Sequence, residues 1–317
     1  MHRWLLWTLL AVFCWGVWAL LGKLIGEALS PALTQALSTI GLIPVILALG
    51  FSMNIRGKAR LASAVPNPLT HAGGGEGNRR RGALLALGAG TLTCLGNVAY
   101  YGVLNRGAKA ATVVPLTALY PVVTVLLAVM VLKERLNLIQ IAGIGLSLIA
   151  IYLFNVQEEQ GFLSAWLLVA LIPVTLWGIA GLLQKLATND ISGERSTLWF
   201  LAAFVPVAAG ILVQQSWPAR IAPRTWLLVT ALGLTFALGN YALLAAFASN
   251  GKASVITPLA GLYPLVSIPI AILLLGERIG WRETLGITLA LVSAAALACE
   301  SRPAPSEISK LKPELPT

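Results

Sequence analysis

The sequence predicts an all-α membrane protein in which ten transmembrane helices form two inverted five-helix repeats. Three observations support this fold class. Of the 317 residues, 57% are hydrophobic and only 11% are charged, whereas soluble domains carry about 25% charged residues. The chain divides into ten apolar runs, each close to the roughly 20 residues that a bilayer core requires. The second half of the chain also repeats the pattern of the first.

Charged or Gly/Pro-rich breaks separate the apolar runs. We place the runs at 4–25, 31–52, 83–104, 111–132, 137–155, 165–187, 196–215, 226–247, 254–275 and 280–299. A signal peptide is an alternative for the first run, because a basic residue precedes it. However, the run is as long as a full span and its pattern recurs at 166–187, so we interpret it as a helix.

The internal repeat is read from residues that recur at constant offsets. The offset is 162 residues early in each half and 143 residues later, as in Trp15 with Trp177, Pro44 with Pro206, Asn97 with Asn240 and Gly143 with Gly286. The first half thus has 19 additional residues, the difference between 162 and 143, and they lie in the Gly-, Pro- and Arg-rich segment 53–82, which we expect to be a disordered loop. We therefore predict repeats at 1–156 and 157–300, and a disordered tail at 301–317.

Five spans in each half force the second repeat to enter the membrane from the opposite side. With a cytoplasmic N-terminus, 15 of the 22 Lys and Arg residues fall on the inner side, which the positive-inside rule favours. We expect both termini and the 53–82 loop to be cytoplasmic, in a bacterial-type inner membrane. The net charge of +10 is thus an orientation signal, and no basic helix predicts a nucleic-acid partner.

Two apolar runs contain matched prolines, Pro115 with Pro258 and Pro121 with Pro264. Proline removes a backbone donor and frees a carbonyl, which a water-lined cavity tolerates better than lipid does. These helix breaks therefore either line a central cavity or shape a kinked bundle. The motif continues with Glu134 and Glu277, which we interpret mainly as caps of the helices that follow.

Each half thus has five helices with Pro-x4-Tyr-Pro, an apolar run, Glu-Arg and a downstream Gly, and this pattern resembles the EamA domain of the drug/metabolite transporter superfamily. The resemblance covers residues 4–299. It implies a ten-helix carrier of a small organic solute, such as an amino acid, a metabolite or a drug-like compound, often moved outward. It also implies a cavity surrounded by the first, third, fourth, sixth, eighth and ninth helices, with the fifth and tenth to one side. Inverted repeats independently favour an alternating-access carrier.

Polar and aromatic residues within these helices are the candidates for substrate binding. They are Trp15, Lys23, Asn97, Tyr101, Tyr120, Trp177, Lys185, Asn240, Tyr241 and Tyr263. Tryptophan offers a flat face for stacking, an intramembrane amide needs a partner, and a lysine near each helix end could attract an anionic substrate. The alternatives remain open: core packing for the tryptophans, helix-to-helix bonding for the asparagines, interface anchoring for the tyrosines and snorkelling for the lysines.

Other function classes lack the residues that they need. An intramembrane lipid-modifying enzyme requires acids, bases or metal ligands, and a proton-coupled multidrug exporter requires a buried carboxylate, but no Asp, Glu or His falls in the middle of an apolar run. We therefore expect no catalytic residues, no metal and no cofactor, and transport by uniport or exchange. The expected partners are a small-molecule substrate and the lipid bilayer, with the chain a monomer or weak homodimer.

Overall fold

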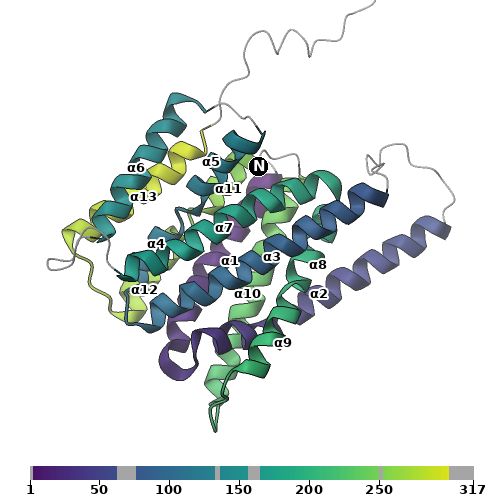
Figure 1. Ribbon diagram of the computed structural model, residues 1–317, viewed down its shortest axis with the longest axis horizontal. Coiled ribbons are helices and arrows are strands. Elements are labelled where there is room, and N and C mark those ends of the chain that lie inside the picture. Colours follow the sequence, from purple (N-terminus) through teal and green to yellow (C-terminus); the bar gives the residue numbers. More distant parts are fainter. Residues whose placement is uncertain (1–2, 63–75, 133–135, 156–164, 250–252, 300–317) are drawn as a thin grey trace, which may run out of the picture.

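The computed structural model describes residues 3–62, 76–132, 136–155, 165–249 and 253–299. These residues form thirteen α-helices and one short 3-10 helix, without a β-strand (Figure 1). The helices are α1 (Arg3–Ile25), η1 (Gly26–Ala28), α2 (Pro31–Ala62), α3 (Glu76–Asn105), α4 (Ala110–Thr117), α5 (Tyr120–Leu132), α6 (Leu138–Asn155), α7 (Ala165–Asp190), α8 (Gly193–Ala202), α9 (Phe204–Gln214), α10 (Pro223–Ala248), α11 (Ala253–Ala260), α12 (Pro264–Leu275) and α13 (Trp281–Leu297).

Eight segments within the described residues are long and apolar enough to cross a membrane. They lie at Arg3–Ile25, Pro31–Met53, Glu76–Asn105, Ala110–Val131, Leu167–Asp190, Gly193–Gln214, Pro223–Phe247 and Ile256–Leu275. Three of them join two consecutive helices, α4 with α5, α8 with α9 and α11 with α12. The apolar part of α6 at 138–154 is shorter, and α13 has 17 residues.

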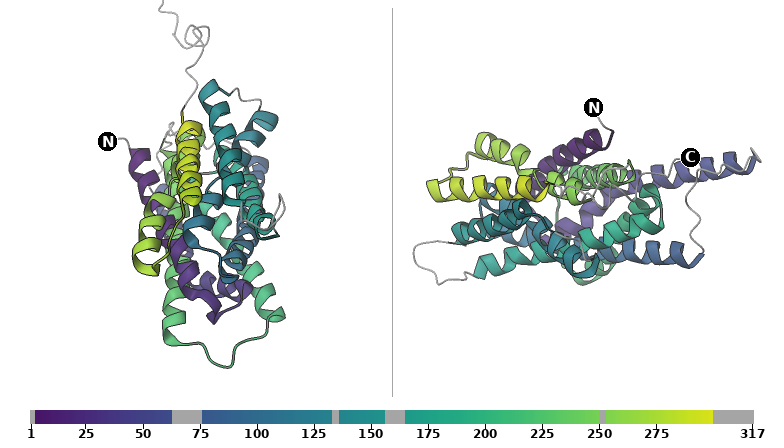
Figure 2. Two further views of the ribbon diagram at one scale, coloured as in Figure 1. Left: turned by 90° about the vertical axis from the view of Figure 1, so that its left-hand side faces the viewer. Right: turned by 90° about the horizontal axis from the view of Figure 1, so that it is seen from above.

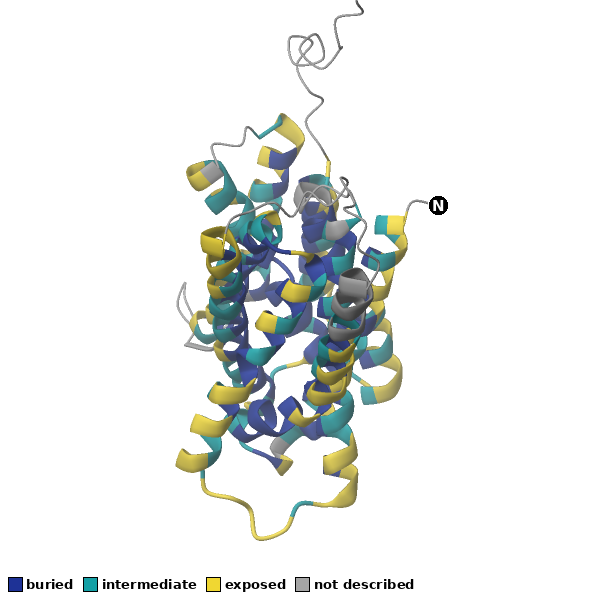
Figure 3. Cartoon of the chain, turned by 90° about the vertical axis from the view of Figure 1, so that its right-hand side faces the viewer, coloured by how far each residue is buried: buried dark blue, intermediate teal, exposed yellow. Residues whose placement is uncertain are grey.

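The outer surface of the helices is apolar, as a lipid environment requires. Large hydrophobic side chains are strongly exposed, among them Leu47 at 65% and Val213 at 87%, with Met130, Leu138 and Leu273 between them. Exposed positions lie along the outer faces of the helices (Figure 3). Contiguous apolar surface on this scale is rare in soluble monomers. The chain is therefore a multi-pass membrane protein.

The helix connections gather at two opposite ends of the molecule. One end, which we call the α3–α4 end, is held by the bond from Ser30 Oγ to Gln215 Oε1, at 3.1 Å. At the other, the α7–α8 end, Asn137 Nδ2 donates to the carbonyl oxygen of Cys299 at 2.9 Å. The helices α6 and α13 pack side by side at one edge of the bundle (Figures 1 and 2).

Two of the spans are interrupted between their matched prolines. The first breaks after Thr117, so that Pro115 lies in α4 and Pro121 in α5. The second breaks after Ala260, between Pro258 in α11 and Pro264 at the start of α12. The two breaks lie against each other, because a Cβ added at Gly261 would be 3.2 Å from Pro121 Cγ and 3.3 Å from the carbonyl oxygen of Ala118.

Close helix crossings recur at positions related by the repeat. A Cβ at Gly90 of α3 would lie 3.0 Å from the carbonyl carbon of Phe200 in α8, and one at Gly233 of α10 would lie 2.9 Å from that of Ser38 in α2. Both pairs obey the offsets of 143 and 162 residues. Only glycine lets the two backbones approach this closely.

The prediction of a disordered loop at 53–82 is wrong for more than half of that segment. The helix α2 continues to Ala62 and α3 begins at Glu76, so residues 53–62 and 76–82 are helical. Charged residues can extend a helix beyond the membrane because water solvates them, and a Glu-to-Arg pair four residues apart favours the helix. Arg80 forms such a pair with Glu76 at 2.6 Å. Residues 63–75 and the predicted tail at 301–317 lie outside the described residues.

Glu277 caps a helix of the other half of the chain. Its carboxylate accepts the first two backbone N–H groups of α4, both at 2.8 Å. Its interpretation as the cap of the following helix is therefore wrong: α13 begins after Gly280, whose N–H donates to Glu283 at 2.6 Å. The tertiary fold brings the α12–α13 connection over the start of α4, which sequence spacing does not reveal. The matching Glu134 lies outside the described residues.

Candidate functional site

A small cavity lies at the centre of the bundle, between the two halves of the chain. Its volume is about 50 Å³. It is lined by residues of α1, α3 and α5 from the first half and of α7, α10 and the α11–α12 junction from the second: Trp15, Trp18, Thr93, Asn97, Tyr120, Trp177, Ala180, Gln184, Phe236, Asn240 and Tyr263. All of these residues are buried in the protein core.

Six of the ten predicted binding residues line this cavity, and they do so as three repeat-related pairs. The pairs are Trp15 with Trp177, Asn97 with Asn240, and Tyr120 with Tyr263. The repeat therefore brings equivalent residues of both halves to one place.

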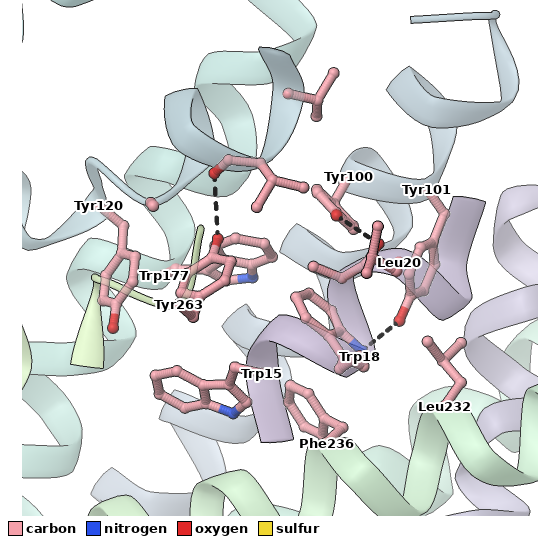
Figure 4. Packing of buried hydrophobic residues seen from close by; sticks show 14 of the residues in the cluster. Trp15, Trp18, Leu20, Tyr100, Tyr101, Tyr120, Trp177, Leu232, Phe236 and Tyr263 are labelled. Carbon is pink, nitrogen blue, oxygen red and sulfur yellow. Dashed lines mark hydrogen bonds between the residues drawn. The ribbon is translucent and has the colours of Figure 1, made fainter. Parts of the chain in front are cut away.

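The aromatic walls of the cavity follow the same pairing (Figure 4). Trp15 meets Tyr263 edge to face with ring centroids 6.3 Å apart, and Trp177 meets Tyr120 likewise at 6.2 Å. Each indole also packs on a glycine of a neighbouring helix, because a Cβ added at Gly239 or Gly96 would lie 2.6 Å from its Nε1 atom. These glycines leave the room that the tryptophans need.

Hydrogen bonding breaks the equivalence within each pair. Trp177 Nε1 donates to the carbonyl oxygen of Thr93 at 3.4 Å, whereas Trp15 Nε1 has no partner in the protein. Asn240 Nδ2 donates to the carbonyl oxygen of Phe236 at 2.9 Å, whereas Asn97 Oδ1 is unpartnered. The indole N–H is thus paired in one tryptophan and unpaired in the other, and of the two amides only that of Asn240 has a hydrogen bond described here through its Nδ2 atom.

The tyrosine pair behaves in the same way. Tyr263 Oη lies 3.4 Å from Thr117 Oγ1 and 3.5 Å from the carbonyl oxygen of Val114. Tyr120 Oη is buried and has no partner in the protein. Three residues that line the cavity, Trp15, Asn97 and Tyr120, therefore each hold a buried polar atom that the fold leaves unpaired.

Sequence reasoning missed five lining residues, Trp18, Thr93, Ala180, Gln184 and Phe236. For Trp18 and Gln184 a signal was available. Trp18 lies three residues after Trp15 and so on the same helix face, and Gln184 is a polar residue within an apolar run. Thr93 and Ala180 carry no such mark. The repeat pairs Trp18 with Ala180 and Thr93 with Phe236, so these positions make the two sides of the cavity different.

Four predicted residues do not line the cavity. Lys23 Nζ donates to the carbonyl oxygens of Ala108, at 2.8 Å, and Leu104, at 3.4 Å, at the C-terminal end of α3. Tyr101 Oη accepts a bond from Trp18 Nε1 at 3.0 Å, and Tyr241 packs against Trp7 with centroids 5.7 Å apart. Lys185 is half-buried in α7 outside the lining. Helix geometry carries these side chains away from the cavity, although their helices contribute to it.

Aromatic packing closes the cavity toward the α3–α4 end. The Trp18 ring stacks on Tyr100 at 5.1 Å and contacts Trp177 at 5.7 Å and Phe236 at 5.6 Å (Figure 4). Tyr100 Oη donates to the carbonyl oxygen of Ala19 at 3.0 Å, which fixes α3 against α1. In the other half, Ala180 takes the place of Trp18, so the lining toward the α7–α8 end is smaller and includes the amide of Gln184.

A second cavity of about 780 Å³ lies at the α3–α4 end. Its rim carries Arg106, Lys109, Arg282 and Glu283, and Lys109 Nζ bonds both oxygens of Glu283, at 2.9 and 3.0 Å. The central cavity has no such charges: none of the described residues that line it is charged. No group of three or more His, Cys, Asp or Glu side chains within the described ranges could hold a metal ion.

Comparison with known proteins identifies the family. Residues 2–156 and 164–299 match the EamA-like transporter family. An uncharacterized protein of Methanocaldococcus jannaschii is 39% identical over 73 residues, which are 23% of this chain and 53% of that protein, so the match spans about half the length of this relative. A crystal structure of a protein matches 92% of this chain and 96% of its own, with a TM-score of 0.61 and 20% identity, which shows a shared fold alone. The chain belongs to the EamA-like transporter family.

Proposed function

We propose that the protein is a secondary carrier that moves a small organic solute across the inner membrane by alternating access. The solute is an amino acid, a metabolite or a drug-like compound, and the physiological direction is export. In this proposal ten helices form two inverted repeats, at 1–156 and 157–300, which rock against each other around the central cavity. The protein has no catalytic role, and both termini are cytoplasmic.

The observation that carries the proposal is the central cavity lined by three repeat-related pairs. Two halves that exchange roles around one site need equivalent residues on both sides of it. The grouping of the connections at two ends and the recurrence of the Gly90 and Gly233 crossings support the inverted arrangement. The closure at Trp18 indicates a state that is shut toward the α3–α4 end.

We propose uniport or exchange as the mode of transport. Proton coupling ordinarily requires an intramembrane Asp, Glu or His that titrates near neutral pH, and the described residues that line the cavity include none of these. The Asn97 and Asn240 amides and the aromatic rings are instead suited to bind a solute without a proton step. A monomer or weak homodimer is sufficient for this mechanism.

Flux measurements in proteoliposomes test the proposal. The purified full chain is reconstituted, and uptake of labelled solutes into vesicles preloaded with the unlabelled solute is measured against protein-free vesicles. The panel contains amino acids, uncharged heterocycles and sugar phosphates. We expect protein-dependent exchange of at least one solute, unchanged by an imposed pH gradient at zero membrane potential. Absence of exchange for every solute would contradict the carrier, and uphill uptake that a protonophore abolishes would contradict uniport or exchange.

Alanine variants of the paired amides connect the cavity to the flux. We expect Asn97→Ala and Asn240→Ala each to lower the exchange rate more than they lower the amount of folded protein. If flux falls only in proportion to folded protein, the amides hold helices together and do not contact the solute.

A further inference from the structure

The three unpaired polar atoms of the central cavity are the starting point. Trp15, Asn97 and Tyr120 are each more than nine-tenths buried, and their Nε1, Oδ1 and Oη atoms have no hydrogen-bond partner in the protein. A buried polar atom that stays unpaired costs about 1–3 kcal/mol, so native proteins keep few of them. The three residues line one cavity, but the atoms themselves are enclosed, so a ligand reaches them only when the two halves move apart. Unpaired atoms in this position indicate a site arranged for a ligand.

The repeat shows that this arrangement is not forced by the fold. Trp177 and Tyr263 occupy the positions equivalent to Trp15 and Tyr120, and there the protein pairs the same atoms, Nε1 and Oη. Asn240, the equivalent of Asn97, donates through its Nδ2 atom. For the tryptophans and the tyrosines, the chain therefore pairs in one half the atom that it leaves unpaired in the other.

The chemistry of the unpaired atoms specifies what the ligand must offer. The indole N–H of Trp15 can only donate, the carbonyl Oδ1 of Asn97 can only accept, and the hydroxyl of Tyr120 can do both. A complementary group needs an acceptor and a donor side by side, as in an amide or lactam. The aromatic walls formed by Trp18, Trp177 and their neighbours favour a flat ring next to that group.

The absence of charge in the lining excludes ions. None of the described lining residues is charged, and an ion moved into an apolar site without a counter-charge loses far more solvation free energy than a neutral amide does. Lys23, which could have supplied a positive charge, is bonded to backbone carbonyls outside the cavity.

We propose that the cavity selects uncharged planar ring compounds that carry an amide-like donor and acceptor, and that it rejects their ionic analogues. Trp15, Asn97 and Tyr120 bind the amide-like group, and the surrounding rings stack on the planar part. This inference rests on the proposed carrier function and narrows its substrate class. The cavity of about 50 Å³ holds about three or four water molecules, so the solute enters when the two halves move apart and replaces that water.

Three probes of the same shape isolate the effect of charge. Benzamide is neutral, benzoate is an anion and benzamidine is a cation at pH 7.5, and all three join a trigonal head to the same ring. Their dissociation constants for the full chain in nanodiscs of zwitterionic lipid are measured by saturation-transfer NMR, with empty nanodiscs subtracted. We expect benzamide to bind at least about 10-fold more tightly than either ion, as the loss of a buried pairing predicts. Equal binding, tighter binding of an ion or no binding of benzamide would overturn the proposal.

Two variants separate ligand binding from folding. Asn97→Leu and Tyr120→Phe remove unpaired groups, so we expect benzamide affinity to fall about 5-fold or more while thermal stability stays the same or rises. The matched control is Asn105→Leu in the same helix α3, because Asn105 Nδ2 donates to the carbonyl oxygen of Leu29 at 3.0 Å. We expect the control to lose stability and to keep its benzamide affinity within twofold. The opposite pattern would show that the unpaired atoms serve the fold.

The flux assay distinguishes the failure of this inference from the failure of the carrier function. If the protein exchanges only charged solutes and does not prefer benzamide, the carrier stands and the neutral-ligand inference falls. If no solute of the panel is exchanged but benzamide is preferred over both ions, the site binds as inferred and the carrier function falls.

Discussion

The crossing of α2 and α10 at Gly233 offers a sharp test of the helix packing. In a Gly233→Ala variant the new Cβ would overlap the carbonyl oxygen of Ser38 and would lie 2.9 Å from its carbonyl carbon and 3.0 Å from Gly41 Cα. Ordinary contact begins at 3.4 Å. All three atoms belong to backbone, so no side chain can rotate away and the two helices must separate.

The size of the effect follows from that separation. Clearing the carbonyl carbon alone requires about 0.5 Å, and a gap of this size already forfeits about a quarter of the dispersion energy across the contact. Overpacking costs about 1–3 kcal/mol, with the upper end expected where backbone surrounds the added atom, while replacing a helical glycine by alanine returns about 1 kcal/mol. We therefore expect a net loss of about 2 kcal/mol, or a melting temperature lower by about 4–8 °C on the scale of soluble domains.

The assay is thermal unfolding in detergent micelles, followed by tryptophan fluorescence. The matched control is Gly145→Ala in α6, where an added Cβ meets no atom within 4 Å. This variant has the same gain in helix propensity without the clash, so its melting temperature should equal or exceed that of the wild type. Gly90→Ala, the repeat-related variant, should resemble Gly233→Ala. If Gly233→Ala melts within 1 °C of the control, the helix spacing described above is incorrect.

Three further predictions concern the ends of the helices. Glu277→Ala should lower stability by about 0.5–2 kcal/mol, the usual cost of a lost N-cap, since the start of α4 loses two hydrogen bonds; an unchanged melting temperature would contradict the capping role. Lys109→Met should cost at most about 1 kcal/mol, because its pair with Glu283 is partly exposed, and the difference from wild type should shrink at high salt. For topology, the exposed native Cys299 should react with an impermeant maleimide only from the cytoplasmic side, and Ser216→Cys in a Cys299→Ser background only from outside; the reverse pattern would invert the proposed orientation.

The apolar runs and the internal repeat could be recognised from the sequence because both depend on local patterns. A span needs about 20 apolar residues wherever it lies, and a constant offset relates Trp15 to Trp177 and Asn97 to Asn240 whatever their contacts are. The matched prolines likewise mark the α4–α5 and α11–α12 breaks, since proline perturbs its own helix. The family, the membrane location and most of the paired cavity residues therefore follow from the chain alone.

Side-chain direction and cross-half contacts depend on the tertiary structure. The sequence placed Lys23 with the binding residues, but the fold turns its ammonium group to the end of α3. The sequence also predicted that Glu277 caps the helix that follows it, whereas in the folded chain its carboxylate caps α4. Most of all, the repeat makes Trp15 and Trp177 look equivalent, and only the packed structure pairs one indole N–H and leaves the other buried without a partner. The physical reason is that hydrogen bonding depends on atomic distances between helices, which no offset along the chain records.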